Sequence, residues 1–506
     1  MRMTSVLTYE KVLPLLTSPR LRRLFVAVAL TSLIFTFLLT LDRPDLVHSH
    51  EARAAQNAQR ILETGEWGLP RLFDGRLELQ KPPAYYWCVA WVSRWLNSGQ
   101  VTTWTTRLPA ALMGIACVAG VYAFLRILGH DGAARLAAIV LASAIHFTAL
   151  SRIARIDVPL TAAVSFSIFG FFLGCKNHYL GNGFHSMLWH FLAGLSAGIA
   201  LLLKGPVGIA LIVCAAGSWW LIEHRRLSWL GFFILITTAA CVGLPWFVWA
   251  NQATNGELFR VFILHHNIAR FNGTSPQLAT HPWWFYIPRF TFDFLPWSPL
   301  FFFGIYYACK NNIWKTDYIL RFSLICFLSM LTLLSISNFK RADYLLPAYP
   351  FAAIFMGCIL QNWRNNQNVK ICNCLKQLFH ILWIVTLIGW FIMVAVTKTS
   401  TSAQSEQSRF AERVRQIAPA PINIIQFRME DHLLSFRLGQ PLETLVEWQD
   451  LHHKITSDNR QRYIYIIMPK DYVYPAIQIL SDIKWKILSQ SEIINNKIYI
   501  LLSANQ

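Results

Sequence analysis

The sequence predicts an α-helical polytopic membrane protein with a small α/β extramembrane domain at its C-terminal end. Hydrophobic residues make up 55% of the 506 residues and charged residues only 14%, against about 25% charged residues in a typical soluble protein. The mean hydropathy is +0.39. Long uncharged apolar runs recur up to about residue 399, after which the composition changes. These observations exclude an ordinary soluble enzyme, a disordered chain and a disulfide scaffold.

The apolar runs predict about eleven membrane spans, with up to thirteen if some runs are split. The first run follows Arg20, Arg22 and Arg23 and is expected to remain as a helix, because it is long for a signal peptide and no small-residue cleavage site follows. The predicted spans cover residues 24–41, 108–125, 136–150, 158–175, 187–203, 206–222, 229–250, 286–307, 319–336, 344–360 and 378–397.

Basic residues predict the orientation of the chain. With a cytoplasmic N-terminus, the connections 126–135, 223–228, 308–318 and 361–377 all carry Lys or Arg and face the cytoplasm, as the positive-inside rule requires. The outer face then receives loops 43–104 and 251–285, a short loop at 151–157 and everything after about 398. Lys340 and Arg341 also fall on the outer face, against the rule, so we expect a separate reason for them. The chemistry is expected in the long outer loops.

The net charge of +19 does not indicate a nucleic-acid partner in this context, because membrane proteins collect Lys and Arg in cytoplasmic loops and pair them with anionic lipids. All ten cysteines lie between Cys88 and Cys374, mostly within apolar runs. A periplasmic disulfide framework is therefore not expected.

The tail is expected to fold separately. A polar stretch at 399–405 separates a membrane domain, residues 1–399, from an α/β domain, residues 400–506. Short apolar runs at 422–427, 463–468 and 497–502 read as strands, with helix-like segments between them.

The first outer loop contains the most informative local pattern. Apolar residues from Ala54 to Leu62 recur at helical spacing, which predicts an amphipathic helix over 51–62 in the membrane interface. Glu51 opens this helix, where a carboxylate is favoured, and a capping role is an equal alternative to a catalytic one. Lys81 stands before Pro82 and Pro83, which end any helix and hold the lysine near the membrane surface.

Spaced motifs in this chain resemble a family. They are Glu51-Ala-Arg53, Gly65-Glu66-Trp67, Lys81-Pro82-Pro83, His266-Asn-Ile-Ala-Arg270-Phe271, His281-Pro-Trp-Trp, Phe294-Leu-Pro-Trp297 and Lys340-Arg-Ala-Asp-Tyr344-Leu-Leu-Pro347. The chain resembles the polyprenyl-phosphate-sugar-dependent glycosyltransferases of GT-C type, which include the 4-amino-4-deoxy-L-arabinose lipid A transferases and the protein O-mannosyltransferases. Two positions depart from the family pattern: His50 replaces the usual Asp, and Gln80 replaces a common Glu.

The resemblance implies that Lys81, Arg270 and Tyr344 bind the phosphate of the lipid-linked donor, because a departing phosphate needs positive charge and hydrogen-bond donors. The alternatives are lipid-headgroup contacts for Lys81 and Arg270 and an interfacial aromatic anchor for Tyr344.

Three further residues are candidates for catalysis. Glu51 is expected to face the sugar and stabilise positive charge at the anomeric carbon. His50 could take a proton from an acceptor hydroxyl. Asp157 could orient the acceptor, pair with Arg152 or Arg155, or simply cap a helix.

Less specific features carry weaker expectations. Lys204 is expected in an outer turn, with a chance of contacting phosphate, and Arg289 and Asp293 are expected to form an intrahelical ion pair. No metal and no cofactor are expected, since His48, His50 and Glu51 lack a fourth ligand and make a weak divalent-metal site.

The expected function is an inverting, metal-independent glycosyltransferase of the bacterial inner membrane. It moves a sugar from a polyprenyl-phosphate donor to lipid A or another envelope acceptor on the periplasmic face, where the C-terminal domain also lies. The alternatives are a protein O-glycosyltransferase, an inactive relative that only binds polyprenyl lipid, and a lipid or sugar transporter. A transporter is disfavoured because ionisable residues cluster at the outer ends of the spans, away from the bilayer midplane.

Overall fold

The structure is a computed structural model, and most of the chain is described by it. The described residues are 31, 34–46, 49–224, 227–274, 280–365, 370–399, 406–419, 423–457, 464–494 and 497–505. Half of the first predicted span, 24–41, lies outside these residues, namely 24–30, 32 and 33.

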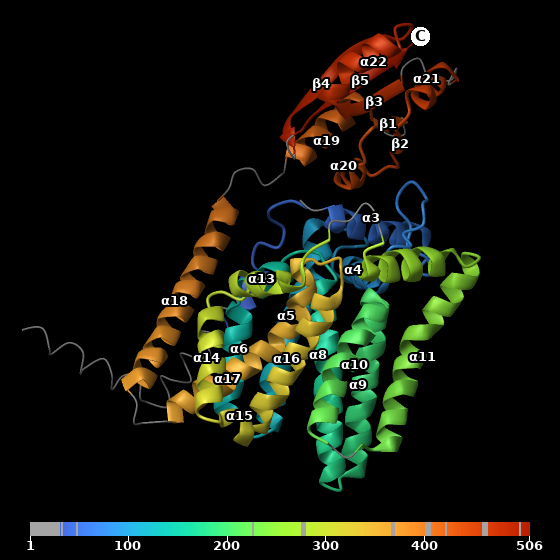
Figure 1. Cartoon of the computed structure of the whole chain (residues 1–506). Coiled ribbons are helices and arrows are strands. Elements are labelled where there is room, and N and C mark those ends of the chain that lie inside the picture. Colours follow the sequence, from blue (N-terminus) through green and yellow to red (C-terminus); the bar gives the residue numbers. More distant parts are fainter. Residues whose placement is uncertain are drawn as a thin grey trace, which may run out of the picture.

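Long apolar helices run side by side in a bundle (Figure 1). Among the residues that the structure describes, six helical segments are long and apolar enough to cross a membrane: α5 (Thr103–Ile127), α8 (Asp157–Tyr179), α9 (Gly183–Lys204), α11 (Trp229–Ala253), α16 (Tyr318–Ile336), and η3 (Ala342–Ala348) continued by α17 (Tyr349–Asn365). A seventh is obtained if α6 (Asp131–Ser143) and α7 (Ile145–Ser151), which are bent by 66° at Ala144, form one span.

Every predicted span after the first coincides with one helix or one broken pair. The others are α10 (Pro206–Ile222), α13 (Tyr286–Asp293) with α14 (Ser298–Lys310), and α18 (Lys370–Thr399); a short α15 (Ile313–Thr316) follows α14. The predicted total of eleven is not confirmed, because α10 is short and two predicted spans are divided at Ala144 and at Leu295-Pro296.

Glycines allow the central helices to approach closely. An added Cβ at Gly170 of α8 would lie 2.9 Å from the carbonyl oxygen of Trp189 in α9, and one at Gly194 of α9 would lie 2.4 Å from that of Leu235 in α11. Small residues at such contacts are typical of membrane bundles, where van der Waals packing replaces the hydrophobic effect between helices. Helix α8 therefore lies in the middle of the bundle, with 94% of its apolar stretch buried.

Shorter helices lie across the end of the bundle that carries the C-terminal domain, which we call the domain end (Figure 1). They include α3 (Ser49–Thr64), α4 (Ala84–Leu96) and α13, and the segment made of π-helix η1 (Phe259–Ala269), α12 (Arg270–Asn272) and η2 (Trp283–Phe285) belongs to the same layer. The amphipathic helix predicted for 51–62 is confirmed as α3. Its apolar face is buried because Ala54, Ala55, Ala58 and Ile61 pack into the main core of the bundle.

The C-terminal domain is built on a five-stranded sheet with strand order β2-β1-β3-β5-β4. The strands are β1 (Ile424–Phe427), β2 (Glu443–Leu445), β3 (Ile464–Pro469), β4 (Lys484–Ile494) and β5 (Lys497–Asn505). Strand β1 pairs in parallel with β2 and β3, with Ile425 opposite Ile466, while β5 runs antiparallel to β3 and β4. The helices are α19 (Glu406–Ile417), α20 (His432–Leu438), α21 (Trp448–Ser457), η4 (Lys470–Tyr472) and α22 (Val473–Ile479).

Three of these strands match the predicted runs, so the α/β class of the tail is confirmed. Strands β2 and β4 were not predicted, because β2 has only three residues and polar and apolar residues do not alternate along β4. Strand β4 forms because it pairs with β5 along most of its length.

The C-terminal domain rests on α3 through polar contacts. The Gln56 side chain donates to the carbonyl of His432 at 2.5 Å. Arg437 and Ser408 both contact the buried Asp45. Burial alone would raise the pKa of Asp45, but Arg437 and Ser408 hold the pKa of this carboxyl below its ordinary value. These contacts fix the domain over the loop that leads into α3.

A buried ion pair joins α3 to the bundle. The Arg107 Nε and Nη2 atoms lie 2.8 and 3.0 Å from the two carboxylate oxygens of Glu51, and both side chains are almost fully buried. Glu51 also accepts from the backbone N–H of Ala154 at 2.9 Å. Arg107 donates to the carbonyls of Leu41, Pro44 and Asp45. One ion pair therefore ties together the loop before α3, α3 itself, α5 and the loop before α8.

Replacing Arg107 with Leu should strongly destabilise the protein. The change leaves the Glu51 carboxylate buried without its cation, which costs roughly 3–5 kcal/mol. The free energy of unfolding can be measured in detergent by thermal or denaturant unfolding. Arg126→Leu removes an exposed ion pair with Asp131 and should leave the stability unchanged, because exposed pairs contribute little. An Arg107→Leu protein as stable as the Arg126→Leu control would contradict this assignment.

Candidate functional site

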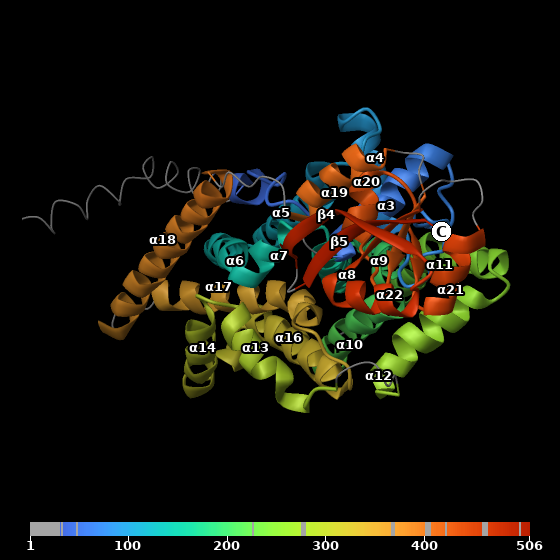
Figure 2. The same ribbon diagram turned by 90° about the horizontal axis from the view of Figure 1, so that it is seen from above.

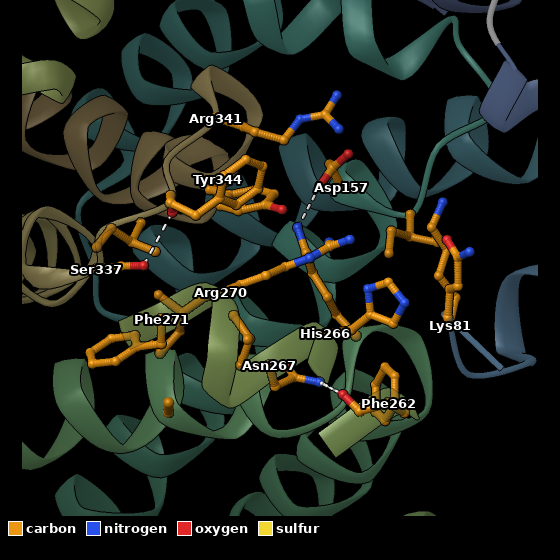
Figure 3. Close-up of a pocket in the computed structure, with 18 of the residues that line it drawn as sticks. Lys81, Asp157, Phe262, His266, Asn267, Arg270, Phe271, Ser337, Arg341 and Tyr344 are labelled. Carbon is orange, nitrogen blue, oxygen red and sulfur yellow. Dashed lines mark hydrogen bonds and ion pairs between the residues drawn. The ribbon is translucent and has the colours of Figure 1, made fainter. Parts of the chain in front are cut away.

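A cavity of about 290 Å³ opens at the domain end of the bundle (Figure 3). Its wall is assembled from α3, the turn before α4, the residues before α8, the α9–α10 junction, the η1–α12 segment, the end of α16 and η3. The lining residues are His50, Gln80, Lys81, Pro82, Arg155, Ile156, Asp157, Lys204, Val207, Ala210, Leu211, Phe262, His266, Asn267, Arg270, Phe271, Leu333, Leu334, Ser337, Phe339, Arg341 and Tyr344. Five of the six predicted site residues therefore meet in one cavity, and Glu51 is the exception.

The junction between α9 and α10 places Lys204 in the wall. Lys204 ends α9, Pro206 begins α10, and Gly205 between them has φ +67° and ψ −145°. A side chain at Gly205 would be strained, and it would also come within 2.5 Å of the Phe262 ring. The Lys-Gly-Pro sequence therefore breaks the helix where its last side chain reaches the cavity.

Asp157 holds two cations in place. Lys204 Nζ lies 2.7 Å from Asp157 Oδ1, and Arg155 Nε lies 3.3 Å from Oδ2. Lys204 also lies over the Tyr344 ring, 4.2 Å from its centroid, in a cation–π contact. The pairing of Asp157 with Arg155 is confirmed. Pairing with Arg152 and capping are not observed: Arg152 donates to the carbonyl of Leu39 instead, and Asp157 is the first residue of α8 rather than its cap. A role of Asp157 in orienting the acceptor stays a prediction.

Lys81 and His50 lie side by side on another wall, with 3.4 Å between Lys81 Nζ and His50 Nδ1. Burial, together with the nearby Arg53 guanidinium, lowers the pKa of Lys81 to about 8. The Lys81 ammonium, together with burial, lowers the pKa of His50 to about 3. At neutral pH, Lys81 is therefore charged and His50 is neutral.

Arg270 extends across the middle of the cavity, with Tyr344 on one side and His266 on the other (Figure 3). Its Nε is buried without a hydrogen-bond partner, and in the described part of the chain no carboxylate lies within ion-pair distance of its guanidinium. The Phe339 ring lies 5.6 Å from the guanidinium carbon. The Phe339 backbone N–H also donates to the Arg270 carbonyl. A cation held in this way is available to an anionic ligand.

The two basic residues that break the positive-inside rule serve this site. Lys340 donates to the carbonyls of His281 and Ser337, which secures the loop 337–341 in the wall of the cavity. Arg341 lines the cavity and lies 3.5 Å from the Asp343 carboxylate. Asp343 in turn pairs with Arg155 at 2.6 Å. These roles explain why Lys340 and Arg341 lie on the predicted outer face against the positive-inside rule.

The predicted catalytic position of Glu51 is wrong in its geometry. Glu51 does not line the cavity, because its carboxylate points into the core and is held by Arg107 and the Ala154 N–H. Glu51 does not cap α3 either, because the partners of its carboxylate belong to α5 and to the loop before α8. Glu51 instead positions its neighbour His50, which does face the cavity.

Four basic or histidine side chains of the cavity were not among the predicted site residues: Arg155, Lys204, Arg341 and His266. Each stood in a quoted motif or in an outer turn, so its place in the sequence was a usable signal. A network beyond the wall was not foreseen at all. There, His146 lies 3.3 Å from Asp343 and 3.5 Å from Asp293. The predicted Arg289–Asp293 ion pair is confirmed at 3.3 Å.

The cavity has the chemistry of an amphiphile site. Its charged lining comprises five cationic side chains, Lys81, Arg155, Lys204, Arg270 and Arg341, and one carboxylate, Asp157. The rest of its wall is largely apolar and comes from α10 and α16, with Val207, Leu211, Leu333 and Leu334. An anionic head and a hydrocarbon tail would each find a matching surface. Among the described residues, no group of three His, Cys, Asp or Glu side chains is placed to hold a metal ion.

Comparison with known proteins found a matching family model and several relatives. Residues 80–249 match the family model described as dolichyl-phosphate-mannose-protein mannosyltransferase. A relative from Pseudomonas aeruginosa (strain UCBPP-PA14), undecaprenyl phosphate-alpha-4-amino-4-deoxy-L-arabinose arabinosyl transferase, is 28% identical over 343 residues. The match covers 66% of this chain and 59% of that relative. The chain spans less than two thirds of the length of the curated relatives that it matches.

Solved structures share the architecture over nearly the whole chain. The crystal structure of ArnT from Cupriavidus metallidurans in the apo state has a TM-score of 0.73 and 17% sequence identity, and the match covers 95% of this chain and 97% of that one. The structure of the same protein bound to undecaprenyl phosphate has a TM-score of 0.70 and 18% identity, with 96% and 98% covered. The resemblance inferred from the sequence motifs is thus confirmed, and the chain is a multi-pass membrane protein with the GT-C fold of ArnT.

Proposed function

We propose that the protein is a glycosyltransferase that moves a sugar from a polyprenyl-phosphate donor to a cell-envelope acceptor. The observation that carries this proposal is one cavity in which unneutralised cations meet an apolar wall between α10 and α16. A polyprenyl-phosphate sugar joins a hydrocarbon chain, a phosphodiester charge and a sugar in that order. The named activity of the relatives and the bound undecaprenyl phosphate of a protein with this fold support the same reading.

The cations would assist departure of the lipid phosphate. When the bond between the anomeric carbon and the phosphate oxygen breaks, the phosphodiester monoanion becomes a polyprenyl-phosphate dianion. We assign Lys81, Arg270 and the Tyr344 hydroxyl to this phosphate, because positive charge and donors stabilise the negative charge that develops there. Lys204, held over the Tyr344 ring by Asp157, lies next to this group. Asp157 is then the residue that keeps Lys204 and Arg155 oriented.

The low basicity of His50 bears on which acceptor group the protein can use. With a pKa near 3, His50 is a weak base, although a bound phosphate would offset part of the surrounding positive charge. A phosphate acceptor needs no base, because its oxygen is already ionised. It attacks the anomeric carbon, and the negative charge passes to the departing polyprenyl phosphate without a proton transfer. We therefore favour a phosphate group of lipid A as the acceptor over a protein hydroxyl, and attack opposite the leaving group gives inversion.

The setting follows from the basic loops. We propose that the protein lies in the bacterial inner membrane with its N-terminus in the cytoplasm. The cavity and the C-terminal domain, which share the domain end, would then face the periplasm. Membrane lipids are its surroundings, and the proposed reaction requires no metal or cofactor, since the side chains of the cavity supply the positive charge.

Mass spectrometry of the cell envelope tests the acceptor. Lipid A and periplasmic glycoproteins are compared in cells with and without the gene. The proposal predicts that a glycosylated lipid A phosphate disappears with the gene. Loss of a protein-linked sugar instead would support the protein O-glycosyltransferase alternative. Accumulation of an untransported lipid-linked sugar with both acceptors unchanged would support a transporter.

Arg270→Gln should lower sugar transfer by about ten- to a hundredfold. The change removes a charge-assisted contact worth roughly 1.5–3 kcal/mol, and about 1.4 kcal/mol corresponds to a factor of ten. Lys310→Gln is the matched control, because Lys310 is an exposed cation at the end of α14 that does not line the cavity. Transfer is measured in single turnover on folded, purified protein. Equal rates for the two variants would show that Arg270 does not contact the donor.

Donor affinity should fall as the pH rises through about 8. Lys81 carries its charge below this pKa, so the contact with the phosphate is complete at lower pH and is lost as the ammonium deprotonates. Between pH 7 and 9 the loss would approach about tenfold. Lys81→Arg keeps a cation that does not titrate in this range. The affinity of this variant for polyprenyl phosphate should therefore not change between pH 7 and 9. Binding of polyprenyl phosphate across this range provides the measurement, and identical profiles for both proteins would count against Lys81.

A further inference from the structure

The charge distribution of the cavity bears on which sugars it can hold. We propose, resting on the proposed function, that the transferred sugar is uncharged or acidic and that the cavity discriminates against a sugar with an ammonium group.

No carboxylate in the lining is free to receive an ammonium group. Asp157 is the only acid among the described lining residues, and both of its oxygens face cations, Lys204 and Arg155. Asp343, the next acid outward, is occupied by Arg155, Arg341 and His146. The segments 47–48 and 275–279, which adjoin cavity residues in the chain but lie outside the described residues, contain no Asp or Glu.

Two acids of the first outer loop, Glu78 and Glu51, are also committed to cations. Glu78 is buried and pairs with Arg53, whose Nε lies 2.7 Å from Glu78 Oε2. Glu51 is held by Arg107 outside the cavity. Gln80 and His50, which do line the cavity, are uncharged donors and acceptors at neutral pH. They suit sugar hydroxyls, and they offer no negative charge.

A charge surplus remains after the donor phosphate is bound. The five cations of the lining exceed Asp157, Asp343 and one phosphodiester charge taken together. Burial and the adjacent Arg270 also lower the pKa of His266 to about 4, which keeps this ring neutral. An ammonium group on the sugar would therefore meet like charge from several sides, whereas a sugar carboxylate would meet Arg341 or Arg155.

Two donors that differ in the charge and the acetylation of one amine test the inference. One is a polyprenyl-phosphate 4-amino-4-deoxypentose, and the other is the same molecule with its amine acetylated. Their affinities for the full-length protein in lipid nanodiscs are measured at pH 7 by displacement of labelled polyprenyl phosphate. The acetylated donor should bind at least about tenfold more tightly, a difference of about 1.4 kcal/mol. A polyprenyl-phosphate hexuronic acid should also bind more tightly than the amine.

The outcomes separate this inference from the proposed function. Equal or tighter binding of the amine donor, with polyprenyl phosphate binding normally, would overturn the inference and leave the proposed function standing. Failure of polyprenyl phosphate itself to bind would overturn both.

A charge change in the wall provides a second test. His50→Asp places a carboxylate beside Lys81. It should reduce the ratio of the two affinities, acetylated donor over amine donor, at least threefold, which is about 0.7 kcal/mol at about 1.4 kcal/mol per factor of ten. His50→Asn places a side chain of the same size as aspartate there, but an uncharged one, and should leave the ratio of the two affinities unchanged. If His50→Asp leaves this ratio as high as His50→Asn does, the charge of this wall does not select the sugar and the inference is wrong.

Discussion

The buried ion pair between Glu51 and Arg107 is the interaction on which the site depends. It is held by groups from four separate parts of the chain, and both charges are removed from water. Burying two charges is costly unless their hydrogen bonds are complete, and here both carboxylate oxygens and several guanidinium donors are used. The N-terminal end of α3 is thereby fixed against α5 and the loop before α8. His50 and Asp157 approach the cavity from the two segments that this ion pair holds together.

The cations of the cavity, unlike Arg107, are not all neutralised by carboxylates. Asp157 orients Lys204 and Arg155, while Arg270 has no carboxylate partner among the described residues and Lys81 has a neutral histidine as its neighbour. Like charges at this spacing favour an anion, and burial together with the nearby Arg53 lowers the pKa of Lys81. The apolar wall below the cations makes the expected anion an amphiphile. The surplus charge that would assist a departing phosphate also restricts the sugars that can be accepted.

Much of this arrangement could be predicted from the sequence, and the failures have physical reasons. Apolar periodicity located the helices of the bundle, and spaced motifs identified Lys81, Arg270 and Tyr344, which lie about 190 and 70 residues apart in the chain and meet in one cavity. Lys340 and Arg341 were recognisable because they broke the charge rule. Glu51 was misplaced because a position at the start of a helix does not reveal which way its side chain points. Its partner Arg107 stands at the edge of an apolar run, where no local pattern marks it. The number of membrane crossings could not be fixed either, since breaks at Ala144 and Leu295-Pro296 divide otherwise continuous apolar runs.

The most direct test of the account is an experimental structure of the protein in a lipid nanodisc with polyprenyl phosphate bound. The account predicts phosphate density within hydrogen-bond distance of Lys81, Arg270 and the Tyr344 hydroxyl, with the hydrocarbon chain along α10 and α16. It also predicts that Glu51 remains paired with Arg107 in the complex. Phosphate bound elsewhere, or a Glu51 carboxylate turned into the cavity towards the ligand, would contradict it.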